Sequence, residues 1–337
     1  MNIPLHMTAV AITTPGGPES LEPRTELVPD WGPGDVLIRV AAAGVNGPDL
    51  AQRRGHYAPP PGASPLPGLE VSGEIVALGD ATTGLAIGDQ VMALTNGGGY
   101  AEYVAVPFGQ VLPIPAGWTL PEAAALPETW FTVTQTLVMR AGLERGMTVL
   151  VHGASGGIGG AAIQISTILG ASAIGVVSNA TKAHYATRLG AIATIERTSQ
   201  DILATVLALT DGRGVDRVLD IIGGTMTETN IKASAIGGHI VQVSTLEGPS
   251  ANVSLRMMMA RQLTLSGSTL RPQTPATKAA IATRIRTDLM PALADANFVR
   301  PGTTLFPLAD AAAAHRAMET RSHTGKIVLV TPFGAAR

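Results

Sequence analysis

The residues of this 337-residue chain that are best suited to chemistry are the small residues between Ala154 and Gly159. They form an Ala-x-Gly-x-x-Gly pattern that follows the apolar run 148–154 and opens a stretch with helical spacing. Glycines in such a strand–turn–helix let the backbone approach a pyrophosphate, which then meets the free N–H groups of the helix. The pattern therefore predicts a dinucleotide site with contacts from Ala154, Ser155, Gly156, Gly157 and Ile158.

The end of the second buried strand distinguishes between the two nicotinamide dinucleotides. NAD-binding proteins place Asp or Glu there, about 20 residues after the glycine turn, to hold the ribose 2′-hydroxyl. This strand ends at Ser178 and Asn179 without an acid, Lys182 adds a positive charge, and Arg197 follows the next short strand. The alternative is that Lys182 and Arg197 are ordinary solvated charges. The missing acid favours NADPH as the cofactor.

Composition excludes several other chemistries. The chain has no cysteine, which excludes disulfides, thiolate zinc sites, iron–sulfur clusters and cysteine nucleophiles and suits a cytoplasmic protein. None of the seven histidines has metal-type spacing, so we expect no metal. The net charge of −2 shows no excess of basic residues that would favour binding to nucleic acid, so we expect no nucleic-acid partner.

A membrane span is the alternative interpretation of residues 146–181. This stretch has no Asp, Glu, Lys or Arg and is long enough to cross a bilayer. Glycines cluster in its middle, however, and a buried parallel strand with its crossover helix also lacks charge. The N-terminus has no basic segment followed by a long apolar one, so we expect no signal peptide. We also expect no membrane partner.

The composition and the hydrophobic pattern of the sequence change near residue 127. The first part is rich in Gly and Pro, and its only helical pattern covers 47–54, so it is typical of a compact β-rich domain. The proline-rich loop 57–68 should form ordered turns. The second part alternates strands with helices, which predicts a parallel, doubly wound sheet. Expected strands cover 36–46, 73–79, 90–94, 101–106, 110–115, 148–154, 173–178, 217–223, 239–244, 263–270 and 326–330, and expected helices 182–190, 274–298 and 308–319.

Many sequence runs, in the same order, resemble the zinc-independent quinone oxidoreductases of the medium-chain dehydrogenase/reductase superfamily. They include PGDVLIRVAAAGVNGPDL (33–50), PGLEVSGEIVALG (67–79), VHGASGGIGGAAIQ (151–164) and TGKIVLV (324–330). The run QRRGHYAPPPGAS (52–64) is similar to one branch of NADPH:quinone oxidoreductases. The resemblance implies an α/β protein with a GroES-like catalytic domain (1–126 and 271–337) and a Rossmann cofactor domain (127–270). It also implies a homodimer, joined near residues 263–270.

The departures from zinc-dependent relatives indicate the type of substrate. Those relatives carry a Cys in the position of Gly44-Val45-Asn46 and a Gly-His-Glu motif where this chain has Gly68-Leu69-Glu70. Without a metal Lewis acid, hydride transfer favours an acceptor that is already electrophilic, such as a quinone or an α,β-unsaturated carbonyl. Two alternatives remain: a zinc-free ketone or aldehyde reductase on the same fold, and a non-enzymatic role like the lens or RNA-binding roles of zeta-crystallin.

The resemblance further implies roles for individual residues. Asn46 and Tyr57 would stabilise the substrate oxygen that gains charge, although Asn46 could instead form a turn and Tyr57 could be a packing aromatic. Thr132, in the first turn of a helix, would contact the cofactor or simply cap that helix. Trp130 would wall the substrate pocket. Further cofactor contacts are assigned to Ile222, Val243, Ser244, Ser268, Leu270 and Lys326.

Two departures from the family pattern concern the cofactor residues. The branch often has a serine in the phosphate turn at the position of Gly156, whereas here the serine stands one place earlier, at Ser155. A catalytic role for that serine is therefore not expected. Arg197 stands where the family usually has a tyrosine near the adenosine, a change that we interpret as keeping or strengthening recognition of a 2′-phosphate.

Overall fold

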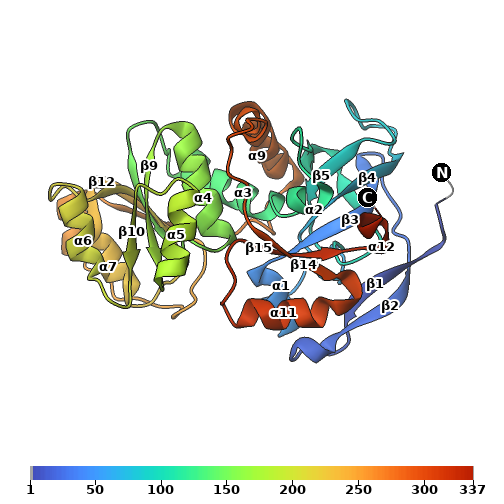
Figure 1. The fold of residues 1–337 in the computed structure, drawn as a ribbon, viewed down its shortest axis with the longest axis horizontal. Helices are drawn as coiled ribbons and strands as arrows, with labels where there is room; N and C mark the ends of the chain where they lie inside the picture. Colours follow the sequence, from blue (N-terminus) through green and yellow to red (C-terminus); the bar gives the residue numbers. More distant parts are fainter. Residues whose placement is uncertain (1–2, 337) are drawn as a thin grey trace. The chain divides into compact units, whose positions relative to one another are not determined.

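The computed structural model describes residues 3–336 and divides the chain into two compact units (Figure 1). Unit 1 joins the chain up to Phe131 with the stretch from Arg271 onward, and unit 2 is Thr132–Leu270. The first break falls slightly beyond the expected residue 126. Residues 1 and 2 lie outside the described residues. They belong to the N-terminal stretch in which we expect no signal peptide.

Unit 1 is built on β-sheets. A hairpin of β1 (His6–Ile12) and β2 (Leu21–Leu27) accompanies a sheet with the strand order β14-β15-β3-β4-β5-β7, in which β6 also pairs with β3. All of its strand pairs are antiparallel except β14–β15. The strands of this sheet are β3 (Asp35–Val45), β4 (Glu70–Leu78), β5 (Gln90–Leu94), β6 (Tyr103–Pro107), β7 (Val111–Pro113), β14 (Thr303–Pro307) and β15 (Lys326–Val330).

The C-terminal part of the chain completes this sheet. The apolar run of β15 inserts between β14 and β3, with Ile327 opposite Val45, and four of its five residues are buried. Helix α11 (Ala311–Glu319) packs against β15, and α1 (Gly47–Arg53) continues directly from β3. Residues far apart in sequence are therefore brought together where β3 ends and β15 begins.

Several expected helices of unit 1 have different limits. The single helix expected over 274–298 is wrong: α9 (Pro275–Asp288) ends early, and a short α10 (Met290–Leu293) follows. The reason is Pro291, which has no N–H to donate and cannot continue the preceding helix. The helix expected over 308–319 begins with a 3₁₀ turn at Leu308–Asp310, and α12 (Pro332–Ala335) follows the strand expected to be last. Two short helices, α2 (Leu120–Ala123) and α3 (Pro127–Val133), precede a π-helical stretch at Thr134–Arg140.

Unit 2 contains the predicted doubly wound sheet. Its six strands are all parallel, in the order β10-β9-β8-β11-β12-β13, which is the arrangement of dinucleotide-binding folds. Strands β8 and β9 are largely apolar and almost wholly buried because helices cover both faces of such a sheet. The strands are β8 (Thr148–His152), β9 (Ser172–Val177), β10 (Ala193–Glu196), β11 (Val215–Asp220), β12 (Ser234–Gln242) and β13 (Thr264–Gly267).

The helices of unit 2 connect these strands. In Figure 1 the green helices α4 (Gly157–Leu169) and α5 (Ala180–Arg188) lie together, apart from the yellow and orange pair α6 (Ile202–Leu209) and α7 (Met226–Ala233). Helix α8 (Leu255–Arg261) packs against β12. The charge-free stretch 146–181 forms β8, α4 and β9, and no helix within residues 3–336 is long and apolar enough to cross a membrane.

Candidate functional site

The turn between β8 and α4 has the geometry that a pyrophosphate requires. Gly153 has a φ of +65°, which favours glycine, and Gly156 caps α4 without any side-chain hydrogen bond. A Cβ on Gly159 would lie 2.3 Å from the carbonyl oxygen of Gly153 and 2.6 Å from Cα of Ala154, so only glycine allows this close packing. The N–H groups at the start of α4 have no side-chain cap to accept their hydrogen bonds and suit an anionic ligand.

The other predicted cofactor residues of unit 2 stand at the same edge of the sheet. Ile222, Val243 and Ser268 each lie in a loop that follows a parallel strand, and the carboxyl ends of parallel strands meet at one edge. The loops are tied to one another: the N–H of Val243 donates to the carbonyl of Asp220 (2.8 Å), and the N–H of Ser268 to that of Gln242 (3.1 Å). Ser244 and Leu270 stand in the same two loops.

Ser268 also has an unused polar atom. Its Oγ is buried and has no hydrogen-bond partner among residues 3–336. A buried hydroxyl without a partner is costly, and a ligand group in the cofactor site would relieve that cost. The residues of unit 2 therefore fit a dinucleotide at the sequence-predicted positions.

A buried series of hydrogen bonds lies beneath this edge, and the sequence analysis did not predict it. Nδ2 of Asn230 donates to Oδ2 of Asp220 (2.9 Å), and Oδ1 of Asn230 lies 2.7 Å from Nε2 of His152. The other carboxylate oxygen of Asp220 accepts the N–H of Ile222 (2.6 Å) and of Gly223 (3.1 Å). Burial lowers the pKa of His152, which keeps the ring neutral. These hydrogen bonds connect β8, just before the glycine turn, to the loop after β11.

The end of β9 has the acid-free arrangement that the sequence predicts. The Oδ1 of Asn179 caps α5 by accepting the N–H of Lys182 (3.0 Å). The N–H of Arg197 donates to the carbonyl of Val177 (3.0 Å), so Arg197 stands beside the end of β9 and close to Ser178. Its guanidinium lies 3.5 Å from the carboxylate of Glu247, in a half-exposed pair of the kind that contributes little.

In unit 1, Asn46 and Lys326 meet at a buried carboxylate that the sequence analysis did not single out. Oε1 of Glu70 accepts Nδ2 of Asn46 (2.8 Å) and lies 2.5 Å from Nζ of Lys326. Its Oε2 accepts the N–H of Glu128 (2.8 Å). Lys326 also donates to Oδ1 of Asn46 (2.5 Å). Both ends of the Asn46 amide are thus occupied within the protein, so the side chain can meet a substrate carbonyl only by exchanging one of these bonds.

Helix α1 is anchored from both ends. At its start, Asp49 accepts the N–H groups of Asn46 (2.8 Å) and Gly68 (2.9 Å), and burial raises the pKa of Asp49 to about 6. At its end, the buried Arg53 pairs with Glu319 of α11 (2.5 Å). These contacts fix the loop that leads from α1 to Tyr57.

Tyr57 lies beneath a buried cation. The guanidinium carbon of Arg271 is 5.5 Å from the centre of the Tyr57 ring. Arg271 is held by Oε1 of Gln52 (2.8 Å) and by the carbonyl of Asn96 (2.9 Å). Burial, with the charges of Glu128 and Asp49, raises the pKa of Tyr57 above its ordinary value. The phenol therefore keeps its proton at neutral pH and can donate a hydrogen bond.

Two further buried titratable groups of unit 1 are Glu128 and Lys278. Glu128 is buried at the start of α3, and its burial, together with the charges of Glu70 and Asp49, raises its pKa to about 8. Lys278 of α9 is buried, and its ammonium donates to the carbonyl of Arg271 (2.9 Å) and to Oδ1 of Asn96. Burial lowers the pKa of Lys278 to about 8. A lone Glu or Lys is usually a surface residue, so the sequence offered no signal for either.

Thr132 stands differently from the expectation, and Trp130 is a buried aromatic of the same helix. Helix α3 begins at Pro127, so Thr132 lies in its second turn and not its first, and the alternative that it caps the helix is wrong as well. Its carbonyl accepts the hydroxyl of Thr136 (2.7 Å). Trp130 is only 2% exposed and packs edge-on against Phe298, with the ring centres 6.5 Å apart.

The residues around Glu70 do not fit a zinc ion. The ammonium of Lys326 already holds the Glu70 carboxylate, and the chain has no cysteine. A Cβ on Gly44 would lie 1.9 Å from Oε1 of Glu70, so a ligating side chain could not stand at position 44. Within residues 3–336 no cluster of three or more His, Cys, Asp or Glu side chains could hold a metal.

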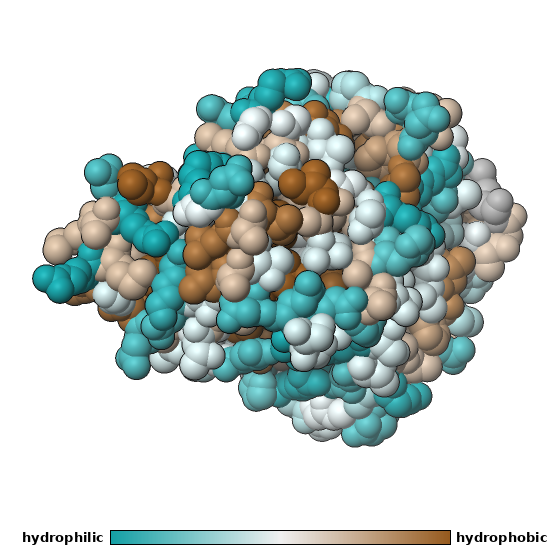
Figure 2. Space-filling view, turned by 60° about the vertical axis from the view of Figure 1, so that its left-hand side comes forward, coloured by the Kyte–Doolittle hydropathy of each residue, from teal (hydrophilic) through white to brown (hydrophobic). Residues whose placement is uncertain are grey.

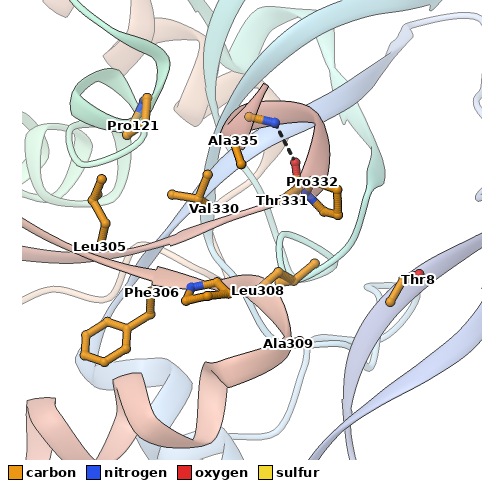
Figure 3. Close-up of a pocket in the computed structure, with 12 residues that line it drawn as sticks. Thr8, Pro121, Leu305, Phe306, Leu308, Ala309, Val330, Thr331, Pro332 and Ala335 are labelled. Carbon is orange, nitrogen blue, oxygen red and sulfur yellow. Dashed lines mark hydrogen bonds between the residues drawn. The ribbon is translucent and has the colours of Figure 1, made fainter. Parts of the chain in front are cut away.

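A separate apolar hollow of about 500 Å³ lies on unit 1 over β14, β15 and α12 (Figure 3). Its walls include Leu305, Phe306, Val330 and Pro332, and a hydrogen bond from Gly334 to Thr331 closes one side. None of the predicted site residues lines it. The hollow is therefore distinct from the polar cluster around Glu70 and Tyr57.

Comparison with known proteins identifies two domain families in this chain. Residues 32–116 match the alcohol dehydrogenase GroES-like domain, and residues 157–283 match the zinc-binding dehydrogenase family. A quinone oxidoreductase of Pseudomonas aeruginosa is 33% identical over 320 residues, which cover 94% of this chain and 97% of that protein. The chain belongs to the quinone oxidoreductase family of medium-chain dehydrogenases/reductases.

Solved structures extend the comparison. The mycobacterial protein Rv1454c complexed with NADPH is 30% identical, with a TM-score of 0.82 over 96% of this chain and 99% of that one. An NAD-dependent alcohol dehydrogenase is 32% identical, with a TM-score of 0.81 and the same coverage. The predicted α/β fold, with a GroES-like part and a Rossmann part, is therefore confirmed.

The close packing at Gly159 leads to a testable prediction. Gly159→Ala should lower the free energy of unfolding by about 1–3 kcal/mol, because its Cβ would press on backbone atoms that cannot yield. It should also weaken dinucleotide binding by displacing the turn. Urea unfolding and fluorescence titration measure both effects.

Gly160→Ala is the matched control for this prediction. Its Cβ would meet only the flexible end of Leu189, at 3.0 Å, and alanine favours the helix. The control should therefore change stability and binding little. Equal effects of the two substitutions would contradict the role given to Gly159.

Proposed function

We propose that this protein is an NADPH-dependent reductase that reduces quinones or α,β-unsaturated carbonyl compounds without a metal ion. The observation that carries the proposal is the buried cluster of Lys326, Glu70 and Asn46, in which an ammonium engages the carboxylate in place of a metal. Without a Lewis acid to polarise a simple ketone, the acceptor must itself be electrophilic.

The side chains of unit 1 can assist such an acceptor. The neutral phenol of Tyr57 can donate to an oxygen that gains negative charge, and the guanidinium of Arg271 above its ring favours that charge. Asn46 is held in one orientation by Glu70 and Lys326. The cofactor, when bound, supplies the hydride, and the protein positions the acceptor and completes the protonation. Trp130 remains our proposal for a wall of the substrate pocket.

Three features support NADPH over NADH. No carboxylate stands at the end of β9, where NAD-binding proteins hold the ribose hydroxyl. Lys182 and Arg197 stand beside that end, and the weak partner of Arg197 can be exchanged for a phosphate. NADPH is also the ligand named for the mycobacterial relative. We assign the pyrophosphate to residues 154–158 and the nicotinamide to the loops that hold Ile222, Val243, Ser244, Ser268 and Leu270, with Thr132 and Lys326 as further contacts.

The choice of cofactor can be tested at the two cations. Lys182→Ala with Arg197→Ala should raise the Kd for NADPH by about 10–100-fold, since charge-assisted hydrogen bonds contribute about 1.5–3 kcal/mol. The Kd for NADH should stay within about twofold, because NADH lacks the 2′-phosphate. Arg188→Ala, at the exposed end of α5, is the matched control. Equal losses for both cofactors would refute this assignment.

A zinc-free ketone or aldehyde reductase is the second candidate, and the similarity to a dehydrogenase of alcohols favours it. The two candidates differ in the acceptor that they activate. Only the second would need the phenol of Tyr57 to polarise an unactivated carbonyl on its own.

An acceptor series tests the proposed reaction. Stopped-flow oxidation of NADPH should be at least about tenfold faster with benzoquinones and enones than with simple ketones or aldehydes, which corresponds to about 1.4 kcal/mol in the barrier. A preference for ketones would favour the second candidate. No acceleration over buffer with any acceptor would exclude both.

We further propose that two copies pair through β13, which is the edge strand of its sheet. Figure 2 shows hydrophobic residues, in brown, reaching the surface of the molecule among hydrophilic ones. Those of unit 2 include Leu265 on β13 and, more exposed, Leu255 and Met259 of the neighbouring α8. An open strand edge beside exposed apolar side chains is typical of a two-fold interface.

Light scattering after gel filtration should give the mass of a dimer for the wild type. Leu265→Lys should give a monomer, because a charge would then lie at the paired edge. Leu209→Lys, at an exposed position of α6, should leave the dimer intact. A monomeric wild type at micromolar concentration would exclude the interface.

A further inference from the structure

Asp220, the last residue of β11, holds its carboxylate in the interior of unit 2. The side chain is fully buried, and a buried charge is costly unless hydrogen bonds satisfy it. Three N–H donors do so: those of Ile222 (2.6 Å) and Gly223 (3.1 Å) reach Oδ1, and Nδ2 of Asn230 (2.9 Å) reaches Oδ2. One carboxylate oxygen therefore holds the loop after β11, and the other is held by α7.

The direction of the hydrogen bonds follows from the chemistry of the partners. A carboxylate only accepts, so the amide nitrogen of Asn230 faces Asp220 and the amide oxygen faces His152. Nε2 of His152, 2.7 Å from that oxygen, must therefore carry a hydrogen and donate it. Burial lowers the pKa of His152 and keeps the ring neutral, so its single N–H is the one on Nε2. This arrangement of hydrogens satisfies all three contacts.

These hydrogen bonds join the pyrophosphate turn to the loop after β11. His152 ends β8 and stands directly before Gly153, the first glycine of that turn. Asn230 is fully buried on α7 and bonds to His152 on one side and to Asp220 on the other. The loop also packs against the turn, since a Cβ on Gly153 would lie 2.6 Å from Cδ1 of Ile221. A shift of the loop relative to the turn would stretch or break buried hydrogen bonds.

The loop after β12 is attached to the same acid. The N–H of Val243 donates to the carbonyl of Asp220 (2.8 Å). Further along this loop, the N–H of Glu247 donates to the carbonyl of Ile222 (2.9 Å). The loop after β12 therefore follows the loop after β11 when that loop moves. These are two of the loops to which we assign the nicotinamide.

We propose that Asn230 is a positioning residue for the nicotinamide end of the cofactor: by orienting Asp220, it fixes the loop after β11 relative to the pyrophosphate turn. This role rests on the cofactor assignment proposed above, in which the dinucleotide has its pyrophosphate at the turn and its nicotinamide at the loops. Asn230 acts through Asp220 and not on the reacting atoms. Its effect should therefore be confined to the part of the ligand that the loops hold.

A pair of ligands tests this role, because 2′-phospho-ADP-ribose has the groups of NADPH except the nicotinamide. Asn230→Ala should raise the Kd for NADPH by about tenfold, which corresponds to about 1.4 kcal/mol. The Kd for 2′-phospho-ADP-ribose should stay within about twofold, because the backbone N–H groups of the turn still hold the pyrophosphate. The single-turnover rate of benzoquinone reduction should fall about 10–100-fold, because a small displacement misaligns the hydride. Calorimetric titration and stopped-flow kinetics measure these effects.

Ser234→Ala is the matched control. Ser234 begins β12, at the opposite end of that strand from the loop, and its hydroxyl donates to the carbonyl of Asn230 (2.7 Å). The substitution removes a buried hydrogen bond of α7 but leaves the Asn230 amide in place. It should lower the temperature of thermal unfolding without changing either Kd or the single-turnover rate.

The direction of the hydrogen bonds can be measured in the wild type itself, whether or not Asn230→Ala folds. Nitrogen NMR of protein labelled at histidine should show a hydrogen on Nε2 of His152 and none on Nδ1. The signals of His152 are assigned by their loss in His152→Gln. A hydrogen on Nδ1 would overturn the proposal, because Asn230 could then not orient Asp220 as described.

Two results for Asn230→Ala would also overturn the proposal and leave the reductase function intact. One is an equal weakening of NADPH and 2′-phospho-ADP-ribose, which a purely structural role would produce. The other is a folded variant with the wild-type Kd for NADPH and the wild-type single-turnover rate. A wild type that binds no NADPH would instead refute the cofactor assignment, and the role of Asn230 would fall with it.

Discussion

The arrangement of unit 1 depends on one buried ion pair, that of Lys326 and Glu70. Both side chains are almost wholly inaccessible to water, and removing two charges from water costs more than their attraction returns unless further hydrogen bonds satisfy them. Asn46 and the N–H of Glu128 provide those bonds. The pair therefore fixes three separate segments at once: β15, the end of β3, and the start of α3.

The same pair determines the protonation of its neighbours. Burial raises the pKa of Glu128 to about 8, and the negative charge of Glu70 adds to the effect because it makes a second carboxylate beside it unfavourable. Asp49 is equally buried, but two backbone N–H groups stabilise its charge, and its pKa rises only to about 6. At neutral pH one of these two acids is thus uncharged and the other is mostly ionised. The difference arises from hydrogen bonding, since both acids are buried.

The sequence predicted unit 2 better than unit 1, for a physical reason. A phosphate turn and the end of the next strand are local features, so the residue types from Ala154 to Lys182 carry most of the information about them. The cluster around Glu70 joins residues 46, 70, 128 and 326, and only the folded chain brings them together. The resemblance to a known family supplied Asn46, Tyr57 and Lys326, but it did not indicate Glu70, Glu128 or Arg271. The prediction of one helix over 274–298 failed for a different reason. Pro291 is visible in the sequence and was sufficient to predict that the helix would be interrupted there.

The charges that act on Tyr57 bear on the reductase function proposed above. Arg271 lies 5.5 Å from the centre of the Tyr57 ring, whereas burial raises the pKa of both acids that act on the phenol, Glu128 and Asp49. In the proposed reaction, the charge of Arg271 would stabilise an acceptor that becomes an anion when hydride arrives, as the oxygen of a quinone or enone does. It disfavours an acceptor that is already positively charged.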